Sequence, residues 1–102
     1  MQSKLRATLK DGVTTVAALI SHPMEVGTRR DPSTDQLIPR HFIQEIIWRH
    51  GTETVMSADW GWGVSTNPYL SFQFEGGRLG DLVTLQWIDN RGMTETVEAR
   101  IA

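Results

Sequence analysis

The stretch LVTLQWIDNRGMTETVEARI, residues 82–101, decides the fold class of this chain. Its first part places three large apolar residues on one face, namely Val83, Leu85 and Trp87. The Asp-Asn-Arg-Gly run at 89–92 predicts a tight turn. The alternation then resumes, and its inward residues are predicted to be Met93, Val97, Ala99 and Ile101. A period of two residues on both sides of a turn is typical of antiparallel strands joined as a hairpin.

Period-two alternation extends outward from this hairpin over almost the whole chain. It predicts further strands at Lys4–Lys10, Val13–Ile20, Phe42–Trp48, Glu53–Ala58 and Tyr69–Phe74. About seven short strands with frequent turns predict an all-β fold, an immunoglobulin-like antiparallel β-sandwich, in a single domain of residues 1–102. A small antiparallel barrel has the same alternation and is the rival architecture.

Composition narrows the class of function. The 102 residues carry a formal net charge of −2, so no basic surface favours nucleic acid or an anionic membrane as partner. No apolar run approaches the roughly 20 residues that cross a bilayer. The first residues, 1–6, do not resemble a secretory signal. Cysteine is absent, which excludes disulfides and thiolate chemistry within the chain.

Two of the predicted strands, at 13–20 and 42–48, carry apolar residues on both faces. In the second of them, Ile43 and Ile47 are predicted to lie on the face opposite Phe42, Ile46 and Trp48. The outer face of a two-layer sandwich normally meets water, so extra apolar surface there indicates a partner. Cover by the long loop that precedes this strand explains it equally well, and both interpretations stay open.

That long loop, SHPMEVGTRRDPSTDQLIPR at residues 21–40, separates two of the predicted strands. Long loops in small domains are usually functional or disordered. Both ends mix apolar residues with proline, so we predict that 22–24 and 37–39 are ordered. The charged, turn-rich run from Arg29 to Asp35 is predicted to be a mobile, solvated tip.

Three histidines, His22, His41 and His50, are the candidate metal ligands. They lack local ligand spacing and would have to converge through the fold, so no metal or other cofactor is predicted. A small metal-binding protein that uses His22 and His41 remains an alternative. Adjacent side chains on an extended strand point to opposite faces, so Ser21 and His22 cannot form a nucleophile–base pair. No catalytic residue is predicted, and the chain is not expected to be an enzyme.

The run Asp59-Trp60-Gly61-Trp62-Gly63 is an unusual local cluster. Its tryptophans fit core packing first and a partner contact second, because tryptophan is enriched at binding hot spots. A ligand-binding β-sandwich that uses Trp60 or Trp62 as a stacking platform, as for a sugar, is a further alternative.

Several segments in a fixed order resemble the SoxZ family. They are the runs LISHPME at 19–25, LIP at 37–39, HFIQE at 41–45, Trp60-Gly61, GVS at 63–65, NPYLSF at 67–72 and WIDNRG at 87–92. The resemblance covers essentially the whole chain. Trp62 departs from the small residue or proline expected there.

The resemblance implies a non-catalytic scaffold that forms a heterodimer with a SoxY-like subunit, whose cysteine carries sulfur intermediates of thiosulfate oxidation. It also implies transient docking to periplasmic Sox enzymes and export together with the signal-bearing partner. Without that partner, the apolar surface could drive self-association. The residues predicted to contact the partner are His22, Pro23, Met24, Ile43, Ile47, Trp60 and Trp62.

Overall fold

The computed structural model describes residues 3–61 and 63–102, and within them the chain forms seven β-strands. These strands are β1 (Lys4–Lys10), β2 (Val13–Leu19), β3 (Ile43–His50), β4 (Glu53–Asp59), β5 (Tyr69–Glu75), β6 (Leu82–Asp89) and β7 (Thr94–Arg100). The predicted all-β class is confirmed. In the same residues, no helix is long and apolar enough to cross a membrane.

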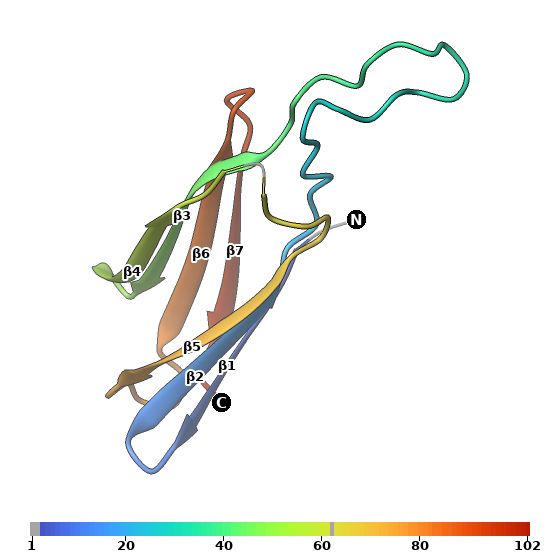
Figure 1. The fold of residues 1–102 in the computed structure, drawn as a ribbon. Helices are drawn as coiled ribbons and strands as arrows, with labels where there is room; N and C mark the ends of the chain where they lie inside the picture. Colours follow the sequence, from blue (N-terminus) through green and yellow to red (C-terminus); the bar gives the residue numbers. More distant parts are fainter. Residues whose placement is uncertain (1–2, 62) are drawn as a thin grey trace.

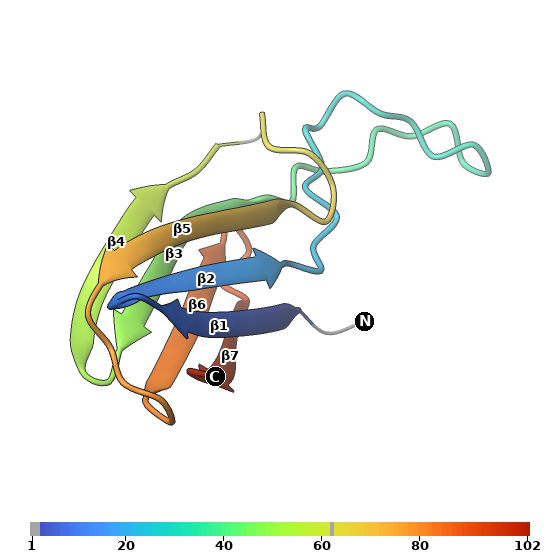
Figure 2. The ribbon, with the colours of Figure 1, turned by 90° about the horizontal axis from the view of Figure 1, so that it is seen from below.

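The strands form two antiparallel sheets that face each other as layers (Figures 1 and 2). One has the order β1-β2-β5 and the other β4-β3-β6-β7. The buried side chains between them belong to Ala7, Val16, Ala18, Ile20, Met24, Ile43, Ile46, Trp48, Val83, Leu85, Trp87 and Ile101. Two separate sheets around one core confirm the predicted sandwich in place of the rival barrel.

The β1–β2 hairpin follows from its two turn residues. Asp11 and Gly12 both have positive φ, 52° and 76°, which is the type I′ geometry that matches strand twist. Lys10 then pairs with Val13 across the turn. The register sets Ala7 opposite Val16, and both side chains are buried in the core.

A β-bulge near the start of β3 corrects one prediction. The register with β6 shifts between Ile43 and Glu45, so the chain gains an extra residue there. As a result Ile43 lies on the same face as Ile46, and both are fully buried. The prediction that Ile43 faces outward is therefore wrong, whereas Ile47 does lie half-buried on the outer face.

Met93 also differs from its predicted place in the core. Its side chain is 55% exposed, and β7 begins only at Thr94. The reason is the turn after β6, where the Met93 N–H donates to Asp89 Oδ1 at 2.9 Å. This bond keeps Met93 within the turn, before the alternation of β7 begins.

The long loop forms an arm, residues 25–41, that projects from one end of the sandwich (Figures 1 and 2). Its two sides pair at Glu25–His41 and at Arg30–Leu37. The Ile38 N–H also donates to the Arg29 carbonyl at 2.8 Å. The arm therefore has hydrogen bonds of its own, including a bond at 2.8 Å from the Ser33 N–H to Asp31 Oδ1 near its tip. The mobility of residues 29–35 stays a prediction.

Gly77 lies where a glycine is required both by φ and by space. Its φ is +89°, and a Cβ would lie 2.5 Å from Thr14 Oγ1. Thr14 is fully buried, and its hydroxyl donates to the Gly76 carbonyl at 2.7 Å. Gly76 has a similar φ of +96°, but a Cβ there would meet nothing within 4 Å.

We therefore expect Gly77→Ala to destabilise the protein more than Gly76→Ala. Both should lose about 1 kcal/mol for the left-handed backbone. Gly77→Ala should lose about 1–3 kcal/mol more, because the added methyl group displaces Thr14. Urea unfolding of the two variants measures the difference, and equal losses would show that Thr14 moves aside freely.

Candidate functional site

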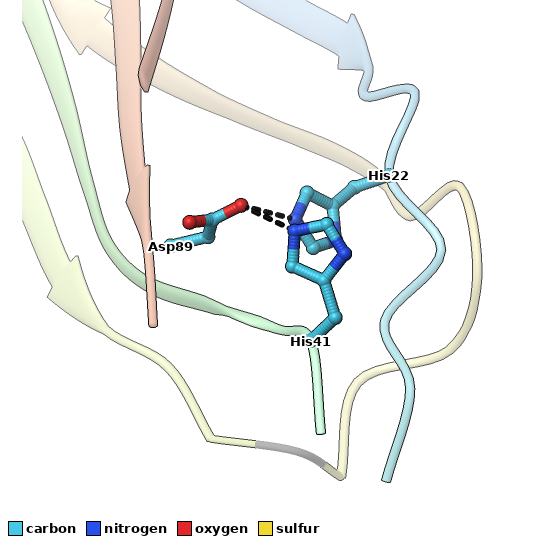
Figure 3. Close-up of side chains that lie close together, drawn as sticks. All are labelled: His22, His41 and Asp89. Carbon is cyan, nitrogen blue, oxygen red and sulfur yellow. Dashed lines mark hydrogen bonds and ion pairs between the residues drawn. The ribbon is translucent and has the colours of Figure 1, made fainter. Parts of the chain in front are cut away.

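Three polar side chains meet where the arm joins the sandwich (Figure 3). His22 follows β2, His41 precedes β3, and Asp89 ends β6. The Nε2 atoms of His22 and His41 lie 3.1 and 2.6 Å from the same atom, Asp89 Oδ2. Both ends of the loop are thus tied to one carboxylate. We call these residues the His–Asp–His cluster.

Asp89 accepts hydrogen bonds at both of its oxygens. Oδ2 receives the two histidines, and Oδ1 receives the backbone N–H groups of Arg91 and Met93, each at 2.9 Å. Burial alone would raise the pKa of Asp89. The hydrogen bonds from the two histidines, aided by those backbone groups, outweigh burial and hold the pKa below its ordinary value of 3.8. Asp89 is therefore a buried carboxylate.

The hydrogen bonds of His22 fix its tautomer. Its Nδ1 accepts the Met24 N–H at 3.1 Å, so Nδ1 carries no proton. The ring proton lies on Nε2, from which it is donated to Asp89. Burial lowers the pKa of His22 below 6.5, the bond to Asp89 acts against this, and the neighbouring His41 lowers it further. His22 is therefore a neutral imidazole in the folded chain at neutral pH.

Neighbouring groups hold the His22 ring and backbone in place. Its backbone N–H donates to Asn67 Oδ1 at 3.0 Å, and its carbonyl accepts the Asn67 N–H at 2.9 Å. The ring meets Trp87 edge-on with centroids 5.0 Å apart, and it meets His41 with centroids 4.5 Å apart. A surface pocket of about 310 Å³ borders the cluster and is also lined by Ser21, Met93 and Glu95.

The cluster has the composition of a metal site, but its hydrogen bonds do not fit one. Its three potential ligand atoms lie within 4.8 Å of one another. A neutral histidine that binds a metal through Nε2 carries its proton on Nδ1 and donates it to an acceptor. At His22 that atom instead faces the N–H of Met24. Metal binding would set two N–H groups against each other, so this donor set does not support the metal-binding alternative.

Comparison with known families assigns the chain. A family model described as "Sulphur oxidation protein SoxZ" matches residues 1–100 of the 102. The chain belongs to the SoxZ family. A search of curated proteins gives no match. The resemblance inferred from the sequence is thus confirmed, and membership of the SoxZ family makes the chain a partner within the Sox sulfur-oxidation system.

Three of the residues predicted to contact a partner are buried among the described residues of this SoxZ chain, and the partner contact itself stays a prediction. His22, Met24 and Ile43 are buried, at 3%, 4% and 0% exposure. Their side chains therefore support the fold and the arm from inside, and they are not available to a partner in this conformation. Of the others, Pro23 is exposed, Ile47 and Trp60 are half-buried, and Trp62 lies outside the described residues.

Trp60 packs against the core cluster, in agreement with the first interpretation of the tryptophan run. The backbone N–H of Trp60 donates to the Gln44 carbonyl at 2.8 Å, beside the β3 bulge. His50 lies apart from the other histidines, and its Nε2 is 2.7 Å from Asp81 Oδ2. Sequence reasoning missed Asp89, which it placed only in a turn. The one available signal was an aspartate directly after a buried strand.

Proposed function

We propose that this SoxZ chain is the non-catalytic scaffold of a SoxYZ-type carrier. It would bind a SoxY-like chain whose cysteine holds the sulfur intermediates, and would present that chain to periplasmic Sox enzymes. The family match over residues 1–100 is the observation that carries this proposal. The absence of cysteine supports it, since the carrying thiolate must then come from another chain. We further propose that the chain reaches the periplasm with its exported partner.

Co-expression with the SoxY-like chain encoded nearest to this gene tests the proposal. We expect one stable complex with one copy of each chain, measured by light scattering after gel filtration. The isolated SoxZ chain should not turn over thiosulfate, sulfite or sulfide. Two separate species, or turnover by the isolated chain at high purity, would contradict the scaffold role.

For the partner we propose the outer face of the β1-β2-β5 sheet, because large apolar side chains are exposed there. Leu19 pairs across strands with Tyr69, and their exposures are 38% and 69%. On the other edge of β2, Leu19 pairs with Lys4 of β1. Together with Arg6 these residues line a shallow hollow of about 530 Å³. Exposed apolar surface rimmed by polar groups is typical of interaction sites.

The charges around this hollow favour an acidic partner segment. No acidic residue lines it, although the chain as a whole carries a net charge of −2. Among the described residues, no ion pair involves Lys4 or Arg6. Complementary charge at a rim speeds association and selects partners. The SoxY-like segment that binds here should therefore combine carboxylates with an apolar side chain.

Charge reversal tests this surface. The double variant Lys4→Glu, Arg6→Glu should weaken binding of the SoxY-like chain by about tenfold or more, because like charges would then face each other. Lys10→Glu is the matched control, since Lys10 is exposed on the same strand but lies outside the hollow. Titration calorimetry measures the affinity of the SoxY-like chain for the unaltered chain and for each of the two variants. If the complex forms and all three affinities agree, the scaffold function stands and this surface is wrong.

A further inference from the structure

The two sides of the arm are joined to the sandwich through the His–Asp–His cluster. Glu25 and His41, the first paired residues of the arm, exchange two backbone hydrogen bonds of 2.7 and 3.0 Å. His41 and His22 both bind Asp89 at the end of β6. The direction of the arm therefore depends on a few bonds within this short region.

Met24 is the strained residue in that region. Its φ is +49°, a left-handed conformation that costs a residue with a side chain about 1–2 kcal/mol. The conformation persists because Met24 is held on both sides. Its N–H donates to His22 Nδ1, and its side chain is 4% exposed beside Ile43, whose N–H lies 3.4 Å from Met24 Sδ.

A second proton on His22 would break this arrangement. The proton can enter only at Nδ1, because Nε2 already carries one. A protonated Nδ1 no longer accepts a hydrogen bond, so two N–H groups would face each other about 3 Å apart. Met24 would then lose the bond that fixes its amide and could leave its left-handed conformation.

We propose that His22 is a proton-controlled joint at the root of the arm. The neutral ring locks Met24 and directs the arm, and protonation frees the arm while the two sheets stay folded. If the arm takes part in docking, the joint makes docking sensitive to acid, and only that consequence depends on the proposed function.

The charged groups around His22 set the direction of its response to pH. Asp89 at the end of β6 favours the proton, whereas His41 before β3 and Arg91 in the turn after β6 oppose it. Glu95 on β7 lines the pocket that borders the cluster. The Glu95 carboxylate accepts a hydrogen bond from Trp87 Nε1–H at 2.9 Å. Burial opposes the proton as well and keeps the pKa of His22 below 6.5. The joint should therefore be locked at neutral pH and open in acid.

Long-range ¹H–¹⁵N spectra of the isolated chain test the locked state directly. At about pH 7.5 we expect His22 to be the neutral tautomer with its proton on Nε2 and a bare Nδ1. A proton on Nδ1 at that pH would overturn the proposal. Because no partner is present, the result does not depend on whether the chain binds a SoxY-like protein.

Amide exchange tests the opening of the joint. Below pH 6.5 the protection factors of the Met24 and Glu25 amides should fall about tenfold per pH unit, because opening takes up one proton. The amides of Leu85 and Trp87 in β6 should stay far better protected than these two at every pH, because they exchange only when the sheets themselves unfold. Equal protection factors at all four amides, or no loss at Met24, would contradict a local joint.

Two variants then assign the effect to one histidine. His22→Gln removes the titrating ring and should abolish the steep pH dependence at Glu25. His50→Gln removes another histidine that binds a carboxylate, Asp81, far from the arm, and should leave the dependence unchanged. A His22→Gln chain that keeps the steep trend would overturn the proposal. If that variant does not fold, the tautomer and exchange data of the unaltered chain decide.

Discussion

Replacing Ile43 with aspartate should unfold this protein, whereas Ile47→Asp, four residues along the same strand, should leave it folded. Ile43 is fully buried beside Met24 in the core, and Ile47 is half-buried on the outer face of β3. A carboxylate without a partner in the core costs several kcal/mol. Domains of this size are stable by only about 5–15 kcal/mol in total. Circular dichroism and thermal unfolding should therefore show no cooperative transition for Ile43→Asp.

The Ile47 variant separates folding from binding. Its added charge remains near solvent, so the melting temperature should fall by only a few degrees, consistent with a loss of about 1 kcal/mol. Any loss of SoxY-like binding by Ile47→Asp would then report contact at this face of β3. A folded Ile43→Asp chain with a normal melting temperature would show that the bulge does not place Ile43 in the core.

The bulge also shows where sequence reasoning reaches its limit. Most of the seven strands were predictable because they have period-two alternation, and nearly all are bounded by turn residues. Nothing in the run from Phe42 to Trp48 marks the extra residue near Gln44, because a bulge arises from pairing with β6. One inserted residue reverses the face of every residue before it. That is why the alternation places Ile46 and Trp48 on the correct face and Ile43 on the wrong one.

The His–Asp–His cluster could not be predicted from the sequence, for a related reason. His22 and Asp89 are 67 positions apart and lie in different layers, so no local spacing connects them. Because β6 lies beside β3 in the sheet, its last residue Asp89 comes next to His41 at the root of the arm, and His22 enters the same place from the end of β2. Sequence reasoning identified His22 and His41 as residues that flank one loop. It could not supply the carboxylate between them, nor the Met24 amide that fixes the tautomer.

Removing the Asp89 carboxylate should also greatly reduce the stability of the protein. Asp89→Ala leaves four donors without their acceptor, and the His22 ring among them is buried. A buried donor that loses its acceptor costs about 1–3 kcal/mol, so the loss of the acceptor for these donors together should cost several kcal/mol. Urea unfolding at about pH 7 measures this loss. Asp81→Ala is the matched control, because Asp81 also binds a histidine, His50, but its side chain is 37% exposed.

The control should lose much less stability, because an exposed pair is screened by solvent. Equal losses for Asp89→Ala and Asp81→Ala would show that burial adds nothing to the cluster.

The dependence of stability on pH gives a second and independent test of the same network, since Asp89→Ala lacks one titrating group whose pKa is shifted by folding.

Both shifted groups in the cluster make the protein less stable in acid. The pKa of Asp89 is lowered from 3.8, so its contribution is present above 3.8 and is lost as the pH falls through the lower, folded value. The pKa of His22 is lowered from 6.5, so the unfolded chain takes up a proton below 6.5 that the folded chain refuses. Stability should therefore begin to fall below pH 6.5 and fall further below 3.8.

In Asp89→Ala the decline of stability below pH 3.8 should be reduced, because the carboxylate that causes much of it is gone. A variant whose stability falls as steeply as the unaltered chain's below pH 3.8 would show that other carboxylates control acid unfolding.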